Sequence, residues 1–220
     1  MGKAGYDGDM SPRKSAAEAR RTRERIIERS VAIGSVEGLE GLTIGRLATD
    51  LGMSKAGVLG HFGTKQALQL AALHGASGLF TRLVWEPVAD LRPGLVRLRA
   101  FCEAWIRYLE QERTAFPGGC LFTAASVEFD TRGGPVHDTV ARFMLRGRRL
   151  LVNDLRIAVE VGELGRGEDP EQLAFELHGL YMGLNQELQL FADATAPART
   201  RRALDRMLGA APPAGTAPRN

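Results

Sequence analysis

The stretch LTIGRLATDLGMSKAGVLGHFGTK, residues Leu42–Lys65, determines the fold that we expect for this chain. It predicts two short helices joined by a tight turn. Gly52 stands where the first helix must end with a positive φ angle, which glycine adopts at least cost. Ser54 can cap the second helix with its hydroxyl group. Val58 and Phe62, four residues apart, give that second helix a buried side.

The spacing of small and apolar residues predicts how these two helices, 44–51 and 55–61, meet. Ala48 allows the second helix to cross close to the first, Gly52 follows four residues later, and Val58 follows six after that. This is the spacing of a helix-turn-helix, whose second helix enters the major groove of DNA. An ordinary helical hairpin, built from the same short helices and glycine turn, is the alternative.

The segment SKAGVLGHFGTKQAL closely resembles the DNA-binding segment of the tetracycline-repressor (TetR) family. In that family a Ser-Lys start, a His-Phe pair and a later lysine recur in this order. The segments RERII and LTIGRLATDLGMS also align with the family, so the close match runs from Arg23 to Leu68. In this chain the recurring residues are Ser54, Lys55, His61, Phe62 and Lys65.

The resemblance implies an all-α fold, with an N-terminal three-helix helix-turn-helix domain and a larger helical C-terminal domain for ligand binding and dimerisation. We expect the DNA-binding domain at 15–65 and the effector-binding domain at 66–209, with disordered tails at 1–12 and 210–220. Outside the helix-turn-helix, apolar spacing and the positions of proline and glycine predict helices at 15–36, 65–84, 93–111, 120–129, 135–161, 170–192 and 197–208.

The same resemblance implies a function for the whole chain. We expect a cytoplasmic homodimer, joined through its last two long helices, that binds a palindromic operator in double-stranded DNA. A small-molecule effector of unknown identity would release this repressor from its operator. Two alternatives remain open: an effector-less DNA-binding or protein-interaction module, and a helical enzyme. The operator, the effector and the choice between repressor and activator cannot be read from the sequence.

The first predicted helix carries a basic run beside the helix-turn-helix. Between Arg13 and Arg29, seven lysines and arginines stand against three glutamates. Such a run can lie along DNA phosphates and release counterions. For Arg25 and Arg29 a solvated helix face is the alternative. Lys65 lies in the first turn of its helix, where its ammonium group and the free N–H groups can share one phosphate.

The exposed side of the second motif helix is expected to face base edges. Gly57 and Gly60 each cost a helix about 1 kcal/mol relative to alanine. Either they let the helix approach the groove closely, or packing allows a short exposed helix to tolerate them. Leu59 stands where the family commonly has a phosphate-binding tyrosine, and leucine can touch a thymine methyl group instead. The expected DNA-binding residues are Thr43, Ser54, Lys55, Ala56, Gly57, Leu59, Gly60, His61 and Lys65.

Two further expectations concern packing in the predicted helices. Gly34 stands where the family often has a large aromatic residue, so the contact there is shallower unless another side chain fills the gap. The family typically binds an effector among the helices of its C-terminal domain, in a pocket with apolar walls and a few polar tips. Each candidate lining residue is otherwise plain core. The candidates are Phe101, Trp105, Tyr108, Phe122, Phe143, His178, Tyr181 and Asn185.

Composition and spacing argue against other kinds of protein. In 220 residues no apolar run is long enough to span a bilayer, and the N-terminus has no apolar signal core. The four histidines stand at no metal-ligand spacing, and the glycines form no phosphate-binding loop, so we expect no metal, cofactor or catalytic residue. Cys102 and Cys120 indicate free thiols, although a disulfide is not excluded. Cys120 is either a small buried residue or a redox-sensing thiol at a helix N-terminus.

Overall fold

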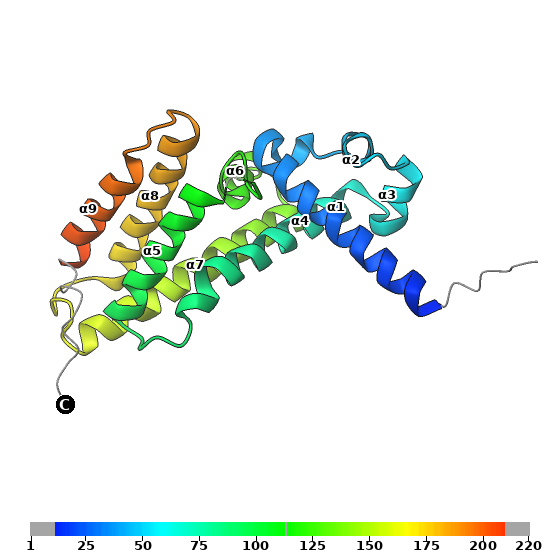
Figure 1. Ribbon diagram of the computed structural model, residues 1–220. Coiled ribbons are helices and arrows are strands. Elements are labelled where there is room, and N and C mark those ends of the chain that lie inside the picture. The colour runs from blue at the N-terminus through cyan, green and yellow to red at the C-terminus, as the bar shows by residue number, and fades with distance from the viewer. Residues whose placement is uncertain (1–11, 113, 210–220) are drawn as a thin grey trace, which may run out of the picture.

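Nine α-helices and no strand make up the part of the chain that the computed structural model describes, residues 12–112 and 114–209 (Figure 1). The all-α fold predicted from the sequence is confirmed. The tails expected at 1–12 and 210–220 lie outside the described residues, apart from Pro12, which begins α1. The helices are α1 (Pro12–Gly41), α2 (Ile44–Leu51), α3 (Lys55–Phe62), α4 (Lys65–Phe80), α5 (Leu95–Gln111), α6 (Leu121–Glu128), α7 (Pro135–Glu160), α8 (Pro170–Gln189) and α9 (Ala196–Leu208).

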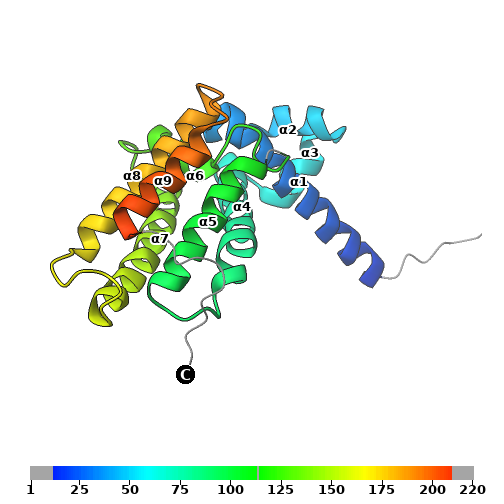
Figure 2. The ribbon, with the colours of Figure 1, turned by 60° about the vertical axis from the view of Figure 1, so that its left-hand side comes forward.

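The three N-terminal helices lie at one end of the molecule, and α5 to α9 form a bundle at the other (Figures 1 and 2). The helix α4 joins the two ends, since it packs against α1 on one side and α7 on the other. The first turns of α1 project beyond the rest of the protein in both views. No helix within the described residues is long and apolar enough to cross a membrane.

Several helix ends differ from the prediction by two or three residues, and two differ by more. The first helix does not stop at 36 but continues to Gly41, with a break at Gly38, where φ is 74° and ψ is 169°. The helix expected to reach 84 ends at Phe80 and continues as a π-helical turn, Thr81–Trp85, and a 3₁₀ turn, Glu86–Val88. Pro87 lacks the N–H group that would extend the α-helical ladder through this segment.

The gap expected beside Gly34 is filled from another helix. A Cβ atom at Gly34 would come within 3.1 Å of the Leu121 Cδ1 atom, so the α6 side chain occupies the space that an aromatic residue would need. The loop before α6 also lies close to α1, because a Cβ atom at Gly118 would stand 2.0 Å from the Ser35 carbonyl oxygen. The backbone N–H of Gly118 donates to Ser35 Oγ at 3.1 Å. These contacts fix α6 against the DNA-binding end of the molecule.

Candidate nucleic-acid interface and internal cavity

The α2 and α3 helices form the predicted helix-turn-helix. Gly52 ends α2 in the left-handed region, with φ 64° and ψ 29°, as the sequence predicts. The Met53 N–H then donates to the Ala48 carbonyl at 2.9 Å, which closes the turn. Leu47 and Ala48 are buried on the inner side of α2. The apolar spacing of the sequence therefore places α3 across α2 at a fixed angle.

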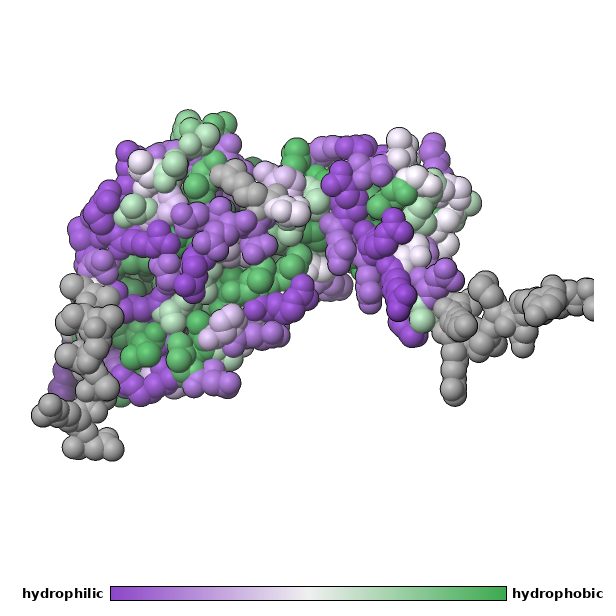
Figure 3. Space-filling model, viewed as in Figure 1, coloured by the Kyte–Doolittle hydropathy of each residue, from purple (hydrophilic) through white to green (hydrophobic). Residues whose placement is uncertain are grey.

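The α3 helix has one buried and one exposed side. Val58 is fully buried and Phe62 is 9% exposed, so these two side chains hold α3 on the domain core. Lys55, Ala56 and Gly60 are exposed on the outer side. In Figure 3 the surface at α3 is pale, between polar and apolar, beside a hydrophilic band along α1. The recognition helix is thus presented at the end of the molecule and is free to enter a groove.

The two glycines of α3 have different surroundings. A Cβ atom at Gly60 would meet no other atom within 4 Å, so the backbone there is bare. Gly57 donates its N–H to the Ser54 Oγ atom at 3.0 Å, and a Cβ atom there would lie 3.2 Å from the same oxygen. Leu59 is 41% exposed and projects from the same helix. The outer face of α3 is therefore small and uncharged apart from Lys55.

Hydroxyl caps position the first turn of each helix around the interface. Thr43 Oγ1 accepts the Arg46 N–H at 3.1 Å, and Thr64 Oγ1 accepts the Ala67 N–H at 3.1 Å. These bonds satisfy N–H groups that have no partner within the helix. The exposed Thr43 can still donate its hydroxyl proton to a phosphate. His61 is half-buried at the end of α3, with its ring tilted against Phe62.

The cations near the helix-turn-helix fall into two groups. Arg29 donates to the Asp50 carboxylate from both Nε and Nη2, which raises the pKa of Arg29 and lowers that of Asp50. Arg46 bridges Glu37 and the same Asp50. These arginines fasten α1 to α2. Among the described residues, no ion-pair partner is found for four exposed arginines of α1, namely Arg20, Arg21, Arg23 and Arg25, and the Arg23 guanidinium lies over the Phe62 ring.

Lys65 is held by the turn that ends α1. Its Nζ atom donates to the Glu40 carbonyl oxygen at 2.7 Å and to the Glu40 carboxylate at 3.0 Å. The hydrogen bond from Lys65 lowers the pKa of Glu40. Lys65 is therefore paired with Glu40 in this structure. Lys55, by contrast, is exposed and lies over Gly45, where a Cβ atom would stand 3.3 Å from Lys55 Cε.

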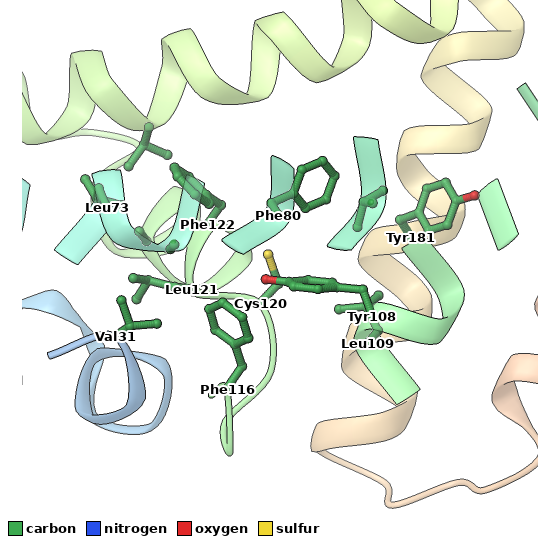
Figure 4. Close-up of a cluster of buried hydrophobic side chains, with 14 of the residues drawn as sticks. Val31, Leu73, Phe80, Tyr108, Leu109, Phe116, Cys120, Leu121, Phe122 and Tyr181 are labelled. Atoms are coloured by element: carbon green, nitrogen blue, oxygen red, sulfur yellow. The ribbon is translucent and has the colours of Figure 1, made fainter. Parts of the chain in front are cut away.

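A cavity lies inside the C-terminal bundle, between α4, α5, α6, α7 and α8 (Figure 4). The space between its side chains, including the solvent at its open side, is about 550 Å³, but the part wide enough to admit water is about 30 Å³. The lining residues are Phe80, Trp105, Leu109, Cys120, Phe122, Thr123, Phe143, Met144, Gly147, Arg148, Leu151, His178, Tyr181 and Met182.

The aromatic rings of the cavity form stacked and edge-on pairs. Phe122 stacks on Phe143, with ring centroids 3.5 Å apart, and Trp105 stacks on Tyr181 at 4.0 Å. Phe80 meets Trp105 and Phe143 edge-on, both at 5.4 Å. Figure 4 shows Phe80 between Phe122 and Tyr181, with the Tyr181 hydroxyl directed away from it. The aromatic rings therefore give the cavity flat, apolar walls.

The structure brings five of the eight candidate pocket residues together and places three elsewhere. Trp105, Phe122, Phe143, His178 and Tyr181 line the cavity. Phe101 packs against Phe80 and Trp85, and Tyr108 packs against Phe80 and Phe116. Asn185 instead uses its Oδ1 atom to accept the Cys120 N–H at 2.9 Å. These three side chains support the walls rather than facing the space.

Arg148 is a lining residue that sequence reasoning missed. The Nε atom of Arg148 is buried and has no hydrogen-bond partner within the described residues. Its Nη2 atom lies 3.5 Å from the exposed Glu171 carboxylate. Burial, and then the charge of Arg148, lower the pKa of His178. The Arg148 side chain as a whole is 42% exposed, and a single arginine between Gly147 and Leu151 gives no signal in the sequence that it lines a cavity.

The cysteines and histidines show no catalytic or metal-binding arrangement within the described residues. Cys102 and Cys120 are both buried free thiols. Burial raises the pKa of Cys102 to about 12, which leaves it protonated and unreactive near neutral pH. His137 lies 3.0 Å from the carboxylate of its neighbour Asp138, in an exposed pair at the start of α7.

Comparisons with known proteins agree with this geometry. Residues 94–204 match the family described as "Tetracyclin repressor-like, C-terminal domain", which covers half of the chain. A TetR transcriptional regulator from Chloroflexus aurantiacus is 22% identical, with a TM-score of 0.78 over 86% of this chain and 95% of that one. A TetR-family regulator from Cytophaga hutchinsonii is 20% identical, with a TM-score of 0.73 over 87% and 94%. AibR, solved with isovaleryl coenzyme A and operator DNA, is 20% identical, with a TM-score of 0.72 over 86% and 100%. No curated protein sequence matches.

An exposed recognition helix on a three-helix domain, joined to a helical bundle with an internal cavity, defines a DNA-binding transcriptional regulator. The matched segment gives the particular family: the chain belongs to the tetracycline-repressor family. This is a family of ligand-responsive regulators that bind DNA as homodimers, and it is generally not enzymatic.

Proposed function

We propose that this regulator is a repressor that binds a palindromic operator through α3 and releases it when a small molecule enters the bundle cavity. The domain at 15–65 would bind DNA and the segment 66–209 would bind the effector and dimerise. The observation that carries the proposal is the two-sided α3 helix, whose inner side is fixed by Val58 and Phe62 while its outer side is bare. As a DNA-binding regulator, the protein would act in the cytoplasm.

The DNA contacts follow from exposure and charge. Lys55 and Lys65 would contact phosphates, with Thr43 and Ser54 at the starts of α2 and α3. Gly60 lets the backbone approach the bases, since no side chain stands between. The base-facing residues would be Ala56, Gly57, Leu59 and Gly60, with His61 at the edge. Leu59 would touch a thymine methyl group, an apolar form of direct readout.

Dimerisation through α7 and α8 is supported by apolar side chains left in solvent. Leu145 on α7 is 53% exposed, and Phe175 on α8 is 61% exposed. Large apolar side chains are stabilised when a second copy covers them. A two-fold dimer sets its recognition helices roughly 34 Å apart, one turn of DNA, which requires a palindromic operator.

The route from cavity to DNA would run through α6. Phe122 and Thr123 of α6 line the cavity, while Leu121 of the same helix packs beside Gly34 of α1. The Glu128 carboxylate, at the end of α6, accepts two N–H groups near the end of α1. A ligand that favours another α6 position would therefore also favour another α1 position and lower the fit of both α3 helices to their half-sites. AibR, which shares this fold, forms a complex with a small molecule and its operator DNA.

Selection of bound duplexes from a random library tests the DNA-binding role. We expect a palindrome whose half-sites are spaced by about one helical turn. Lys65→Ala should weaken binding to all duplexes and lower the salt slope by about one for each half-site. Arg166→Ala, in the exposed loop before α8, is the matched control. Loss of affinity for the selected operator alone, with the salt slope unchanged, would contradict the phosphate role of Lys65.

A further inference from the structure

We infer that the cavity takes a compact aromatic or aliphatic carboxylate, an apolar body with one negative charge. This inference rests on the proposed function, because it names the chemical class of the effector. It depends on three features of the cavity: its flat walls, its single lining cation and the unpaired Nε atom of that cation.

The walls select for a flat or slender apolar body. Phe122 and Phe143 are stacked at 3.5 Å, so little free space remains between α6 and α7. A ligand larger than one or two water molecules must part these rings, because the space wide enough for water is about 30 Å³. A flat ring that replaces Phe122 on the face of Phe143 keeps the stacking energy. A bulky polar ligand such as a sugar loses it and leaves hydroxyl groups without partners.

The charge of the lining selects for an anion. Arg148 is the one side chain carrying a permanent charge among the lining residues, and no aspartate or glutamate lines the cavity. An ammonium ligand would therefore face a like charge with no counter-charge. Glu171 does not neutralise Arg148 well, since it lies 3.5 Å from Nη2 and its side chain is 60% exposed.

The Nε–H group of Arg148 lacks the acceptor that a carboxylate provides. This atom is buried and has no partner within the described residues. An unmade hydrogen bond in a buried place is costly, and a charge-assisted bond to a carboxylate is among the strongest replacements. His178 lines the same cavity, and its ring, which burial and Arg148 hold neutral, keeps one N–H group that can donate a second hydrogen bond to the anion. The Tyr181 hydroxyl points away from Phe80 (Figure 4), and it too is buried without a hydrogen-bond partner within the described residues.

A matched ligand series tests the inference on the full chain. The probes are phenylacetate, 4-phenylbutyrate, 2-naphthoate and octanoate, each beside its amide of nearly the same shape, with 4-phenylbutylamine as the cation. Binding is followed by calorimetry and by Trp105 fluorescence in the Trp85→Phe background. We expect at least one carboxylate to bind about tenfold more tightly than its amide, the contribution of one charge-assisted hydrogen bond. The amine should bind more weakly than either.

Replacing the cation separates charge from shape. Arg148→Gln should remove the preference for the carboxylate and leave amide binding unchanged. Arg149→Gln, the next residue, is exposed and does not line the cavity, so it should keep the preference. Melting temperatures of both variants check that they fold. Equal binding of acid and amide, no binding of any carboxylate, or equal losses in the two variants would overturn the inference.

Operator release distinguishes this inference from the proposed function. A carboxylate that binds through Arg148 without weakening the operator complex refutes the regulatory role and retains the ligand class. A neutral or cationic effector that releases the operator retains the regulatory role and refutes the ligand class.

Discussion

The Glu128 carboxylate accepts a hydrogen bond from the backbone N–H of Leu39 at 2.7 Å, across 89 positions of sequence. It also accepts the Glu40 N–H at 2.8 Å. The break at Gly38 leaves the N–H groups of Leu39 and Glu40 without acceptors in their own helix, and the Glu128 carboxylate of α6 accepts both. Glu128 therefore links α6, which lines the cavity through Phe122 and Thr123, to the end of α1.

Glu128→Ala should destabilise the protein by about 1–3 kcal/mol, because two N–H groups lose their charged acceptor. Urea denaturation at neutral pH measures the change in the free energy of unfolding. Glu160→Ala, at the exposed end of α7, should stay within about 0.5 kcal/mol of the parent. Equal stability of the two variants would show that the Glu128 contact does not hold α1.

Gly60→Ala should stabilise the free protein by up to about 1 kcal/mol and weaken operator binding. The added methyl group meets no atom within 4 Å in the free protein, but it projects where the bases would lie. Gly78→Ala in α4 is also free of contacts and should give the same stabilisation with unchanged DNA affinity. Thermal melts measure the stability of each variant, and a titration with operator DNA measures its affinity. Unchanged operator affinity in Gly60→Ala would mean that α3 merely tolerates its glycine.

The sequence predicted the helices and their caps, because both depend on neighbours within four residues. Ser54 caps α3 as expected for this reason, and its Oγ atom accepts the Gly57 N–H. The interior of the cavity depends on which helices meet, so it was less predictable. Arg148 lines the cavity through contacts between helices that are distant in sequence, and Asn185 accepts the Cys120 N–H from 65 positions away. Single residues of this kind carry no periodic signal.

Glu40→Gln should strengthen binding to all duplexes, specific or not, by a few-fold. The Glu40 carboxylate now holds Lys65 Nζ at 3.0 Å and competes with a phosphate for it. The pKa of Glu40 is lowered by this hydrogen bond, so the carboxylate stays ionised throughout the neutral range. Removing its charge releases Lys65 and reduces repulsion of the DNA backbone. Affinities for operator and random DNA at two salt concentrations measure the effect. Glu168→Gln, in an exposed loop, is the control, and weaker binding by Glu40→Gln would refute the competition.

The stability of the unliganded protein should fall as the pH drops below about 6.5, partly through His178. Burial and the charge of Arg148 hold the folded-state pKa of His178 below its ordinary value of 6.5. As the pH falls through 6.5, the unfolded chain binds this proton before the folded chain does, so the free energy of unfolding decreases until the folded pKa is reached. Urea denaturation at pH 7.5 and 5.5 should show a larger loss for the parent than for His178→Gln. The two proteins differ only at this position, so equal losses would mean that His178 is protonated as easily inside the bundle as in water.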